Sequence, residues 1–207
     1  TQRVPVANGQ QVMTDEDVAL PIVLTGSDPD NDPLTFIVVT PPANGTLTGT
    51  APNVTYTPRA NFNGTDSFTF KVNDGKTDSG AATISITVKP VNDAPVATPQ
   101  SVQVTEDTAK PITLAGTDVD GDTLTFVVVT QPTKGVLSGT APNLTYTPNA
   151  NATGDDSFTF KVNDGKVDSA NATVNLTIGG VNDPPTAIAQ QVTTDEDASK
   201  QITLTGS

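Results

Sequence analysis

Apolar and polar residues alternate along much of this chain with a period of two. The segments "SFTFKV" at 67–72 and "TISITV" at 83–88 show the pattern most clearly. Successive side chains of a strand point to opposite faces, so this alternation is typical of a strand with one buried face. No helical period of useful length interrupts it. The pattern predicts an all-β protein.

Seven candidate strands fall within the first ninety or so residues, and Gly, Pro, Asn and Asp fill the breaks between them. They span 9–14, 19–26, 33–40, 45–49, 53–57, 66–73 and 80–89. Seven short strands are typical of an immunoglobulin-like Greek-key β-sandwich. The chain has no Trp and no Cys pair, so we expect Phe36, Tyr56, Phe68 and Phe70 to supply the bulk of the core.

The pattern repeats at a constant offset of 90 residues. "DSFTFKVNDGK" occurs at 66–76 and again at 156–166, and "VNDAP" at 91–95 returns as "VNDPP" at 181–185. Fixed self-similarity indicates a repeat array. We predict a first repeat at 1–93, a second at 94–183 and the truncated start of a third at 184–207. No signal peptide is visible at Thr1, so we expect a processed chain or a slice of a longer array.

Composition narrows the function classes. The formal charge is −13, from 23 acidic and 10 basic residues, which argues against nucleic acid and anionic membranes as partners. The chain has no His and no Cys, so it lacks the commonest general base and the ligands of most zinc sites. No apolar run approaches the roughly 18 to 20 residues of a membrane span, so we expect no direct membrane insertion.

Acidic residues gather where the strands turn. In the sandwich, the triplet Asp28, Asp30 and Asp32 is predicted to lie with Asp74 at one end of the first repeat. Glu16, Asp17, Asp66, Asn92 and Asp93 are predicted at the other end. The 90-residue offset gives Asp118, Asp120, Asp122 and Asp164, and then Glu106, Asp107, Asp156, Asn182 and Asp183.

Consecutive repeats would bring the second end of one copy to the first end of the next, where the carboxylates would repel without a counter-ion. Ca²⁺ takes six to eight oxygen ligands from such groups, whereas Mg²⁺ demands stricter octahedral order. These eighteen residues are therefore candidate Ca²⁺ ligands, against the alternatives of a solvated turn, a polar strand end or a plain linker. The triplet is not an EF-hand, since that loop needs Gly at its sixth position, where Pro33 and Thr123 stand.

Several segments together resemble a known family. "TLAGTDVDGDTLTFVVV", "LTYTPNAN", "DSFTFKVNDG" and "VNDAPVA" are similar to bacterial cadherin-like tandem repeats of immunoglobulin-like fold, which occur in long secreted adhesins. The resemblance implies extracellular, calcium-rigidified extender domains. It also implies that the Glu-Asp pair, the Asp-x-Asp triplet and the Asn-Asp junction are the cation ligands.

The leading hypothesis is thus a secreted or surface-attached spacer, stiffened by Ca²⁺, whose partners are neighbouring repeats of the same array. A carbohydrate- or protein-binding module is the alternative, but it calls for exposed aromatic residues, and only two Tyr and seven Phe are present. Homophilic adhesion and a self-assembling filament also remain open. We do not expect an enzyme, because the paired carboxylates that a glycosidase would need recur here in every copy at the domain ends.

Overall fold

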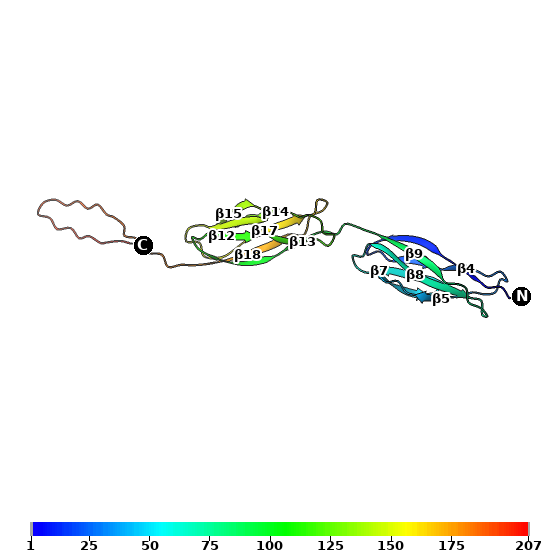
Figure 1. Cartoon of the computed structure of the whole chain (residues 1–207). Coiled ribbons are helices and arrows are strands. Elements are labelled where there is room, and N and C mark those ends of the chain that lie inside the picture. Colours follow the sequence, from blue (N-terminus) through cyan, green and yellow to red (C-terminus); the bar gives the residue numbers. More distant parts are fainter. Residues whose placement is uncertain (1, 207) are drawn as a thin grey trace. The chain divides into compact units, whose positions relative to one another are not determined.

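The computed structural model describes residues 2–206, and the chain divides into two compact units, residues 1–93 and 94–207. Each unit is built from short strands, and no helix occurs between residues 2 and 206. Figure 1 shows the strands along the chain. The all-β, immunoglobulin-like prediction is confirmed.

The first unit contains two main sheets and a small strand pair. The four-stranded sheet has the order β2-β9-β8-β5, the three-stranded sheet has the order β3-β7-β6, and β1 pairs with β4. Strands β2 and β9 run parallel, while all other neighbours are antiparallel. The strands are β1 (Val6–Asn8), β2 (Gln10–Asp15), β3 (Leu20–Val23), β4 (Thr25–Ser27), β5 (Thr35–Thr40), β6 (Gly45–Thr50), β7 (Asn53–Pro58), β8 (Gly64–Asn73) and β9 (Ala82–Lys89).

The second unit repeats this topology strand for strand. Its sheets have the orders β11-β18-β17-β14 and β12-β16-β15, and β10 pairs with β13. The strands are β10 (Val96–Thr98), β11 (Gln100–Thr105), β12 (Lys110–Thr113), β13 (Ala115–Thr117), β14 (Thr125–Thr130), β15 (Gly135–Thr140), β16 (Asn143–Pro148), β17 (Gly154–Asn163) and β18 (Ala172–Gly179).

The structure adds a strand before the first predicted strand and divides the second predicted strand in two. The prediction 9–14 missed β1, and the prediction 19–26 merged β3 with β4. The chain changes partner at these points: β1 pairs antiparallel with β4, whereas β2 pairs in parallel with β9. Alternation of side chains continues through a change of partner, so the period-two signal cannot reveal it.

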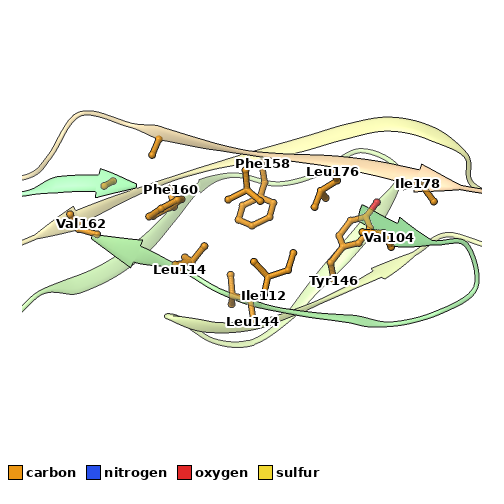
Figure 2. Packing of buried hydrophobic residues seen from close by; sticks show 13 residues of the cluster. Val104, Ile112, Leu114, Leu144, Tyr146, Phe158, Phe160, Val162, Leu176 and Ile178 are labelled. Atoms are coloured by element: carbon orange, nitrogen blue, oxygen red, sulfur yellow. The ribbon is translucent and has the colours of Figure 1, made fainter. Parts of the chain in front are cut away.

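The core of each unit lies between its two main sheets. In the first unit Tyr56, Phe68 and Phe70 are at most 1% exposed, as predicted. Phe36 is half-buried and stacks on Phe70 with ring centroids 6.3 Å apart. Figure 2 shows the corresponding core of the second unit, where Tyr146, Phe158 and Phe160 are fully enclosed. Burying such aromatic rings contributes much of the stability of a small sandwich.

The glycine that opens β6 makes room for the core tyrosine. A Cβ atom on Gly45 would lie 2.4 Å from the Tyr56 ring and 2.6 Å from the Thr57 carbonyl oxygen. Gly135 stands in the same relation to Tyr146, at 2.5 Å. No real Cβ atom tolerates such a distance, so glycine at this position lets the tyrosine lie flat beneath the strand.

Residues 184–206 differ from both sandwiches. They form one isolated bridge, Ala187 to Gly206, and every residue of the segment is exposed. Leu204 is 87% exposed and Ile188 is 55% exposed. The apolar residues of this segment therefore enter neither of the two cores. That it begins a third repeat stays a prediction from the sequence.

Candidate cation site

The predicted acidic residues lie at opposite ends of each unit. At what we call the entry end, where the chain enters the first unit, Gln2 Nε2 donates to Asp74 Oδ2 at 2.7 Å and Arg3 contacts Asp30. At the exit end, Glu16 accepts a hydrogen bond from the Val91 N–H, where the chain leaves the sandwich. The two ends are thus fixed by contacts inside one unit.

The loop that follows β4 holds the first triplet in a tight turn. Asp28 Oδ1 accepts hydrogen bonds from the N–H groups of Asp30 at 2.8 Å and Asp32 at 3.0 Å. Asn31 adopts a positive φ of 59°, and Gly121 takes the same place in the second unit with a φ of 76°. Asn and Gly suit this left-handed conformation, so the loop geometry follows from local sequence.

In the second unit the triplet converges. Asp118, Asp120 and Asp122 each offer a carboxylate oxygen, and these three atoms all lie within 4.8 Å of one another. Asp118 Oδ1 accepts the Asp122 N–H at 3.1 Å. Asp118 Oδ2 is buried and has no hydrogen-bond partner among the described residues. A buried carboxylate oxygen without a donor is costly, and a cation would satisfy it.

A lysine ammonium already neutralises part of each triplet. Lys166 Nζ contacts Asp122 Oδ2 at 2.8 Å, and Lys76 Nζ contacts Asp32 Oδ2 at 3.0 Å. The hydrogen bond to Asp122 raises the pKa of Lys166, with further attraction from Asp164 and Asp120. Both lysines are well exposed, so each ion pair is open to solvent.

Asp74 and Asp164 join the entry end mainly as turn residues. Asp74 Oδ1 accepts the N–H groups of Lys76 at 2.7 Å and Thr77 at 2.6 Å, and Asp164 Oδ1 accepts those of Lys166 and Val167. The Thr77 N–H is the main reason why the pKa of Asp74 lies below its usual range. Each keeps a negative charge beside the triplet while it closes the loop after β8 or β17.

The exit end collects the Glu-Asp pair and the Asn-Asp segment. Glu16 is 3% exposed, and its Oε1 accepts the Val91 N–H at 2.5 Å while Oε2 accepts the Asn63 side chain at 3.4 Å. Glu16 and Asp93 offer carboxylate oxygens within 4.8 Å of each other. Asp17 Oδ1 accepts the Asn61 N–H at 3.1 Å. Glu16 and Asp93 thus bring two carboxylates together inside the first unit.

The second unit has the same exit-end contacts. Glu106 is 4% exposed and accepts the Val181 N–H, and Asp107 accepts the Asn151 N–H at 3.3 Å. Asn182 and Asp183 are exposed, with the Asn182 amide donating to the Asp183 carbonyl oxygen at 3.4 Å. The hydrogen bonds that hold the Glu-Asp pair are therefore a property of the repeat, whereas Asn92 and Asp93 are half-buried and Asn182 and Asp183 are exposed.

Asp66 and Asp156 are held by hydrogen bonds within their own units. Asp66 is 8% exposed and accepts four hydrogen bonds in its own unit, from the N–H groups of Ala43, Asn44 and Ser67 and from the Tyr56 hydroxyl. Asp156 has the same set, with Thr133 and Lys134 in place of the first two. Protein donors occupy these carboxylates, so we assign both to anchoring the β5–β6 and β14–β15 connections instead of to a cation.

These hydrogen bonds decide the charge state of the pair. Burial alone would raise the pKa of Asp66, but the N–H groups of Ser67 and Asn44 and the Tyr56 hydroxyl outweigh it, and the net pKa lies below the usual value. Burial, with help from Asp66, raises the pKa of Tyr56. The pair is thus a carboxylate and a neutral phenol at neutral pH.

Arg3 and the two triplet lysines were missed from the sequence. The signal was present for Arg3, since it stands 90 residues before Asp93 and thus occupies the register position of the junction aspartate. No comparable signal existed for Lys76 and Lys166, because nothing in the sequence tells which exposed lysine reaches a given carboxylate.

Two sandwiches of one topology, repeated along a chain, define a tandem immunoglobulin-like repeat protein. The bacterial Ig domain matches residues 2–87 and again 92–177. The chain belongs to the bacterial Ig domain family. Repeat domains of this kind are typically not enzymes. No helix in the described part of the chain is long and apolar enough to cross a membrane.

Two groups of known proteins are similar to this chain. Integrin beta-like protein A of Dictyostelium discoideum is 30% identical over 247 residues, which is 98% of this chain but 13% of that protein. Integrin beta-like protein E of the same organism is 29% identical and is covered over 12% of its length. The chain thus spans a small part of the curated relatives it matches.

The solved structures support the fold. The human CDH23 EC21-23 structure is 20% identical with a TM-score of 0.61, over 99% of this chain and 79% of that one. Human mucin-like protocadherin EC1-2 is 18% identical with a TM-score of 0.50, over 86% of this chain and 98% of that one. The cadherin-like description of the repeats is therefore confirmed at the level of the fold.

Proposed function

We propose that the chain is a spacer segment of a large extracellular surface protein, and that Ca²⁺ stiffens it. The observation that supports this best is the convergence of Asp118, Asp120 and Asp122, together with the buried, unpartnered Oδ2 of Asp118. Neutral protein donors satisfy other buried carboxylates of this fold, such as Asp156. At the triplet, Asp118 Oδ2 has no such donor among the described residues.

The donor set fits Ca²⁺ better than other metals. All of the candidate ligands are carboxylate, amide or carbonyl oxygens, since the chain has no His and no Cys. Hard divalent cations prefer such donors, and Ca²⁺ tolerates the irregular geometry and high coordination number of an acidic loop. Three carboxylates are too few to fill a shell of six to eight oxygens, so further ligands are required.

We assign the further ligands to the exit end of the preceding repeat. Asn92 and Asp93 stand three or four residues before Val96, the first residue of β10, and the chain between β9 and β10 is short. Carboxylate oxygens of Glu16 and Asp93 already lie within 4.8 Å of each other in the first unit, and Asp17 follows Glu16 in the sequence. In this proposal one Ca²⁺ site needs residues of two repeats, so that binding stiffens the connection. Glu106, Asp107, Asn182 and Asp183 would serve a following repeat in the same way.

The spacer role follows from repetition. In an array each domain touches only its neighbours, so the stiffness of the connections sets the reach of the whole. Bacterial Ig domains are typically extracellular, and the relatives named above carry the name of integrin beta-like proteins. We therefore place the array outside the cell, where Ca²⁺ is abundant, with adhesion carried by other parts of the parent protein.

The proposal is tested by thermal unfolding and small-angle scattering of the full chain, first in excess Ca²⁺ and then in chelator. We expect Ca²⁺ to raise the unfolding free energy by about 2.7 kcal/mol per site at a hundredfold excess over Kd and to narrow the distribution of interdomain distances. Unchanged unfolding midpoints and an unchanged maximum dimension would exclude a calcium-stiffened spacer. Mg²⁺ at the same concentration is the matched control and should have a smaller effect.

A further inference from the structure

The two repeats differ in charge at one position of the chain register. Residues 2 and 3 are Gln-Arg, whereas the register-equivalent residues 92 and 93 are Asn-Asp, and residues 182 and 183 are Asn-Asp again. The substitution replaces an acid by a base just ahead of the first strand. The three aspartates of the loop are the same in the two copies, while the residues between them differ, with Pro29 and Asn31 where the second copy has Val119 and Gly121.

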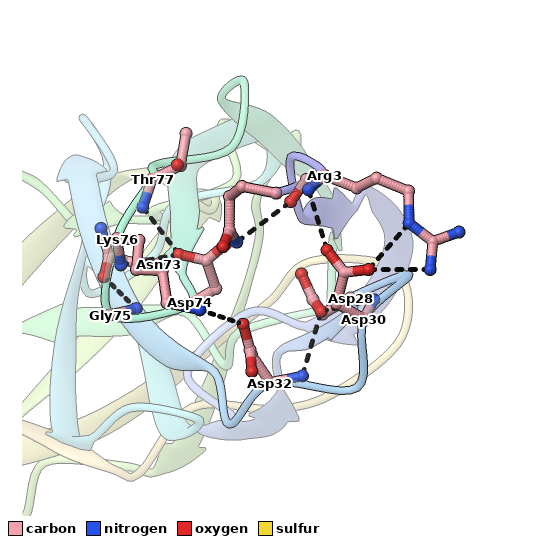
Figure 3. A network of polar contacts seen from close by, with 10 residues as sticks. Arg3, Asp28, Asp30, Asp32, Asn73, Asp74, Gly75, Lys76 and Thr77 are labelled. Atoms are coloured by element: carbon pink, nitrogen blue, oxygen red, sulfur yellow. Dashed lines mark hydrogen bonds and ion pairs between the residues drawn. The ribbon is translucent and has the colours of Figure 1, made fainter.

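In the first unit Arg3 holds the middle aspartate of the triplet from several directions. Its backbone N–H donates to Asp30 Oδ2 at 2.8 Å, its Nε donates to Asp30 Oδ1 at 2.9 Å, and its Nη2 lies 2.8 Å from the same Oδ1. Nη2 also donates to the Pro29 carbonyl oxygen at 2.5 Å. Figure 3 shows the guanidinium placed over the loop, with Asp30 turned toward it. Paired, charge-assisted hydrogen bonds of this kind fix a carboxylate firmly.

The consequence is visible in the two triplets. Oxygens of Asp118, Asp120 and Asp122 gather within 4.8 Å, but among residues 2–206 the oxygens of Asp28, Asp30 and Asp32 form no such group. Both oxygens of Asp30 point to Arg3, and Lys76 takes an oxygen of Asp32. Two side-chain cations thus stand where a metal ion would otherwise bind. Both loops keep the hydrogen bond from the third aspartate N–H to the first aspartate Oδ1, while the first loop also closes a backbone turn from the Asn31 N–H to the Asp28 carbonyl oxygen.

We propose that Arg3 is a built-in counter-ion that makes the first triplet independent of metal, and that the residue at this register position decides whether a repeat takes a cation at its entry end. Arginine supplies a positive charge beside Asp30 from within the repeat, although Asp28 Oδ2 stays buried without a hydrogen-bond partner among the described residues, as Asp118 Oδ2 does. Aspartate at this position leaves the charge to Ca²⁺. The part that concerns the second triplet rests on the proposed calcium site. The part that concerns Arg3 rests on contacts inside the first unit alone.

The test exchanges the two residues in the full chain. Backbone amide resonances of the loops 28–32, except Pro29, which has no amide proton, and 118–122 are followed by NMR during a Ca²⁺ titration of the wild type, Arg3→Asp and Asp93→Arg. In the wild type we expect 118–122 to shift first and 28–32 to shift only at much higher Ca²⁺ concentrations. Arg3→Asp should make 28–32 respond at a Ca²⁺ concentration at least about tenfold lower than in the wild type, because the local charge changes by two units. Asp93→Arg should weaken the response of 118–122 by a similar factor.

A third variant, Arg3→Gln, separates the loss of the guanidinium from the gain of a ligand. It should give 28–32 a response weaker than that of Arg3→Asp but stronger than that of the wild type. The Arg3 side chain is 60% exposed, so none of these changes should disturb the core, and the amide pattern of β8 reports on folding in the same spectra. In chelator, both Arg3 variants should speed hydrogen exchange of the Asp30 and Asp32 amides.

The outcomes separate the two proposals. If 28–32 respond in the wild type at the same Ca²⁺ concentration as 118–122, or if Arg3→Asp gains no response, the counter-ion role of Arg3 is overturned. If 118–122 do not respond in the wild type, the calcium site fails, while a response of 28–32 in Arg3→Asp still supports the role of Arg3. If neither loop responds to Ca²⁺ in any variant, both the calcium site and the counter-ion role of Arg3 are refuted.

Discussion

Replacing Tyr56 by Phe tests whether Asp66 belongs to the fold or to a metal site. The change removes one hydroxyl and leaves the ring, which is fully buried, in place. It deletes the 2.9 Å hydrogen bond to Asp66 Oδ2 and leaves that oxygen with the Asn44 N–H at 2.9 Å. A hydrogen bond to a charged group contributes about 1.5–3 kcal/mol. We therefore expect the first unit to lose about 2 kcal/mol of unfolding free energy.

For a domain of this size a loss of 2 kcal/mol lowers the midpoint by about 8–16 °C. The assay is thermal unfolding followed by NMR, so that the two units are scored separately, with Tyr146→Phe as the matched variant in the second unit. The loss should be equal in Ca²⁺ and in chelator, because no ion takes part. A loss below about 0.5 kcal/mol, or one that appears only in Ca²⁺, would refute the anchoring role of Asp66.

Two further predictions concern charge. The pKa of Asp66 and of Asp156 lies below the ordinary value of 3.8 in the folded state. Their contribution to stability is therefore complete above the unfolded pKa and is lost as the pH falls through the lower folded value. Denaturant unfolding at a series of pH values below 5 should show this loss of stability, and Asp66→Asn should make the loss smaller. Lys166→Gln removes the ammonium from Asp122 and should tighten Ca²⁺ binding by about two- to fivefold, as measured by calorimetry. The control variant Lys76→Gln should leave the calcium affinity of the second triplet unchanged. A weaker calcium affinity in Lys166→Gln would show that the lysine supports the site.

Much of the fold could be predicted because its signals are local. Alternation placed Phe68 and Phe70 in the core, and the 90-residue offset located the repeats. The break between β1 and β2 at Gly9 could not be predicted. It reflects a change of pairing partner from β4 to β9, and the periodicity of side chains does not depend on which strand is the partner.

The candidate site was predictable in outline and not in detail. Turn residues placed the triplets and the Glu-Asp pairs at strand ends, where the structure has them. The surroundings of Asp66 could not be predicted, because an acid beside a turn looks the same in sequence whether it faces solvent or accepts four hydrogen bonds in the interior. The partners that distinguish these cases, such as the Ala43 N–H and the Tyr56 hydroxyl, come from segments remote in sequence.

Asp118→Asn tests the central claim most directly. The asparagine keeps the oxygen that accepts the Asp122 N–H and replaces the buried, unpartnered Oδ2 by an uncharged NH₂. Calorimetric unfolding in chelator and in excess Ca²⁺ measures how much Ca²⁺ raises the unfolding free energy of each variant, and Asp28→Asn is the matched control. We predict that Asp118→Asn is as stable as the wild type or more stable in chelator, and that it loses the gain of about 2.7 kcal/mol that a hundredfold excess of Ca²⁺ over Kd gives the wild type, while Asp28→Asn keeps it. An equal calcium gain in Asp118→Asn and the wild type would contradict the assignment of this triplet as a calcium site.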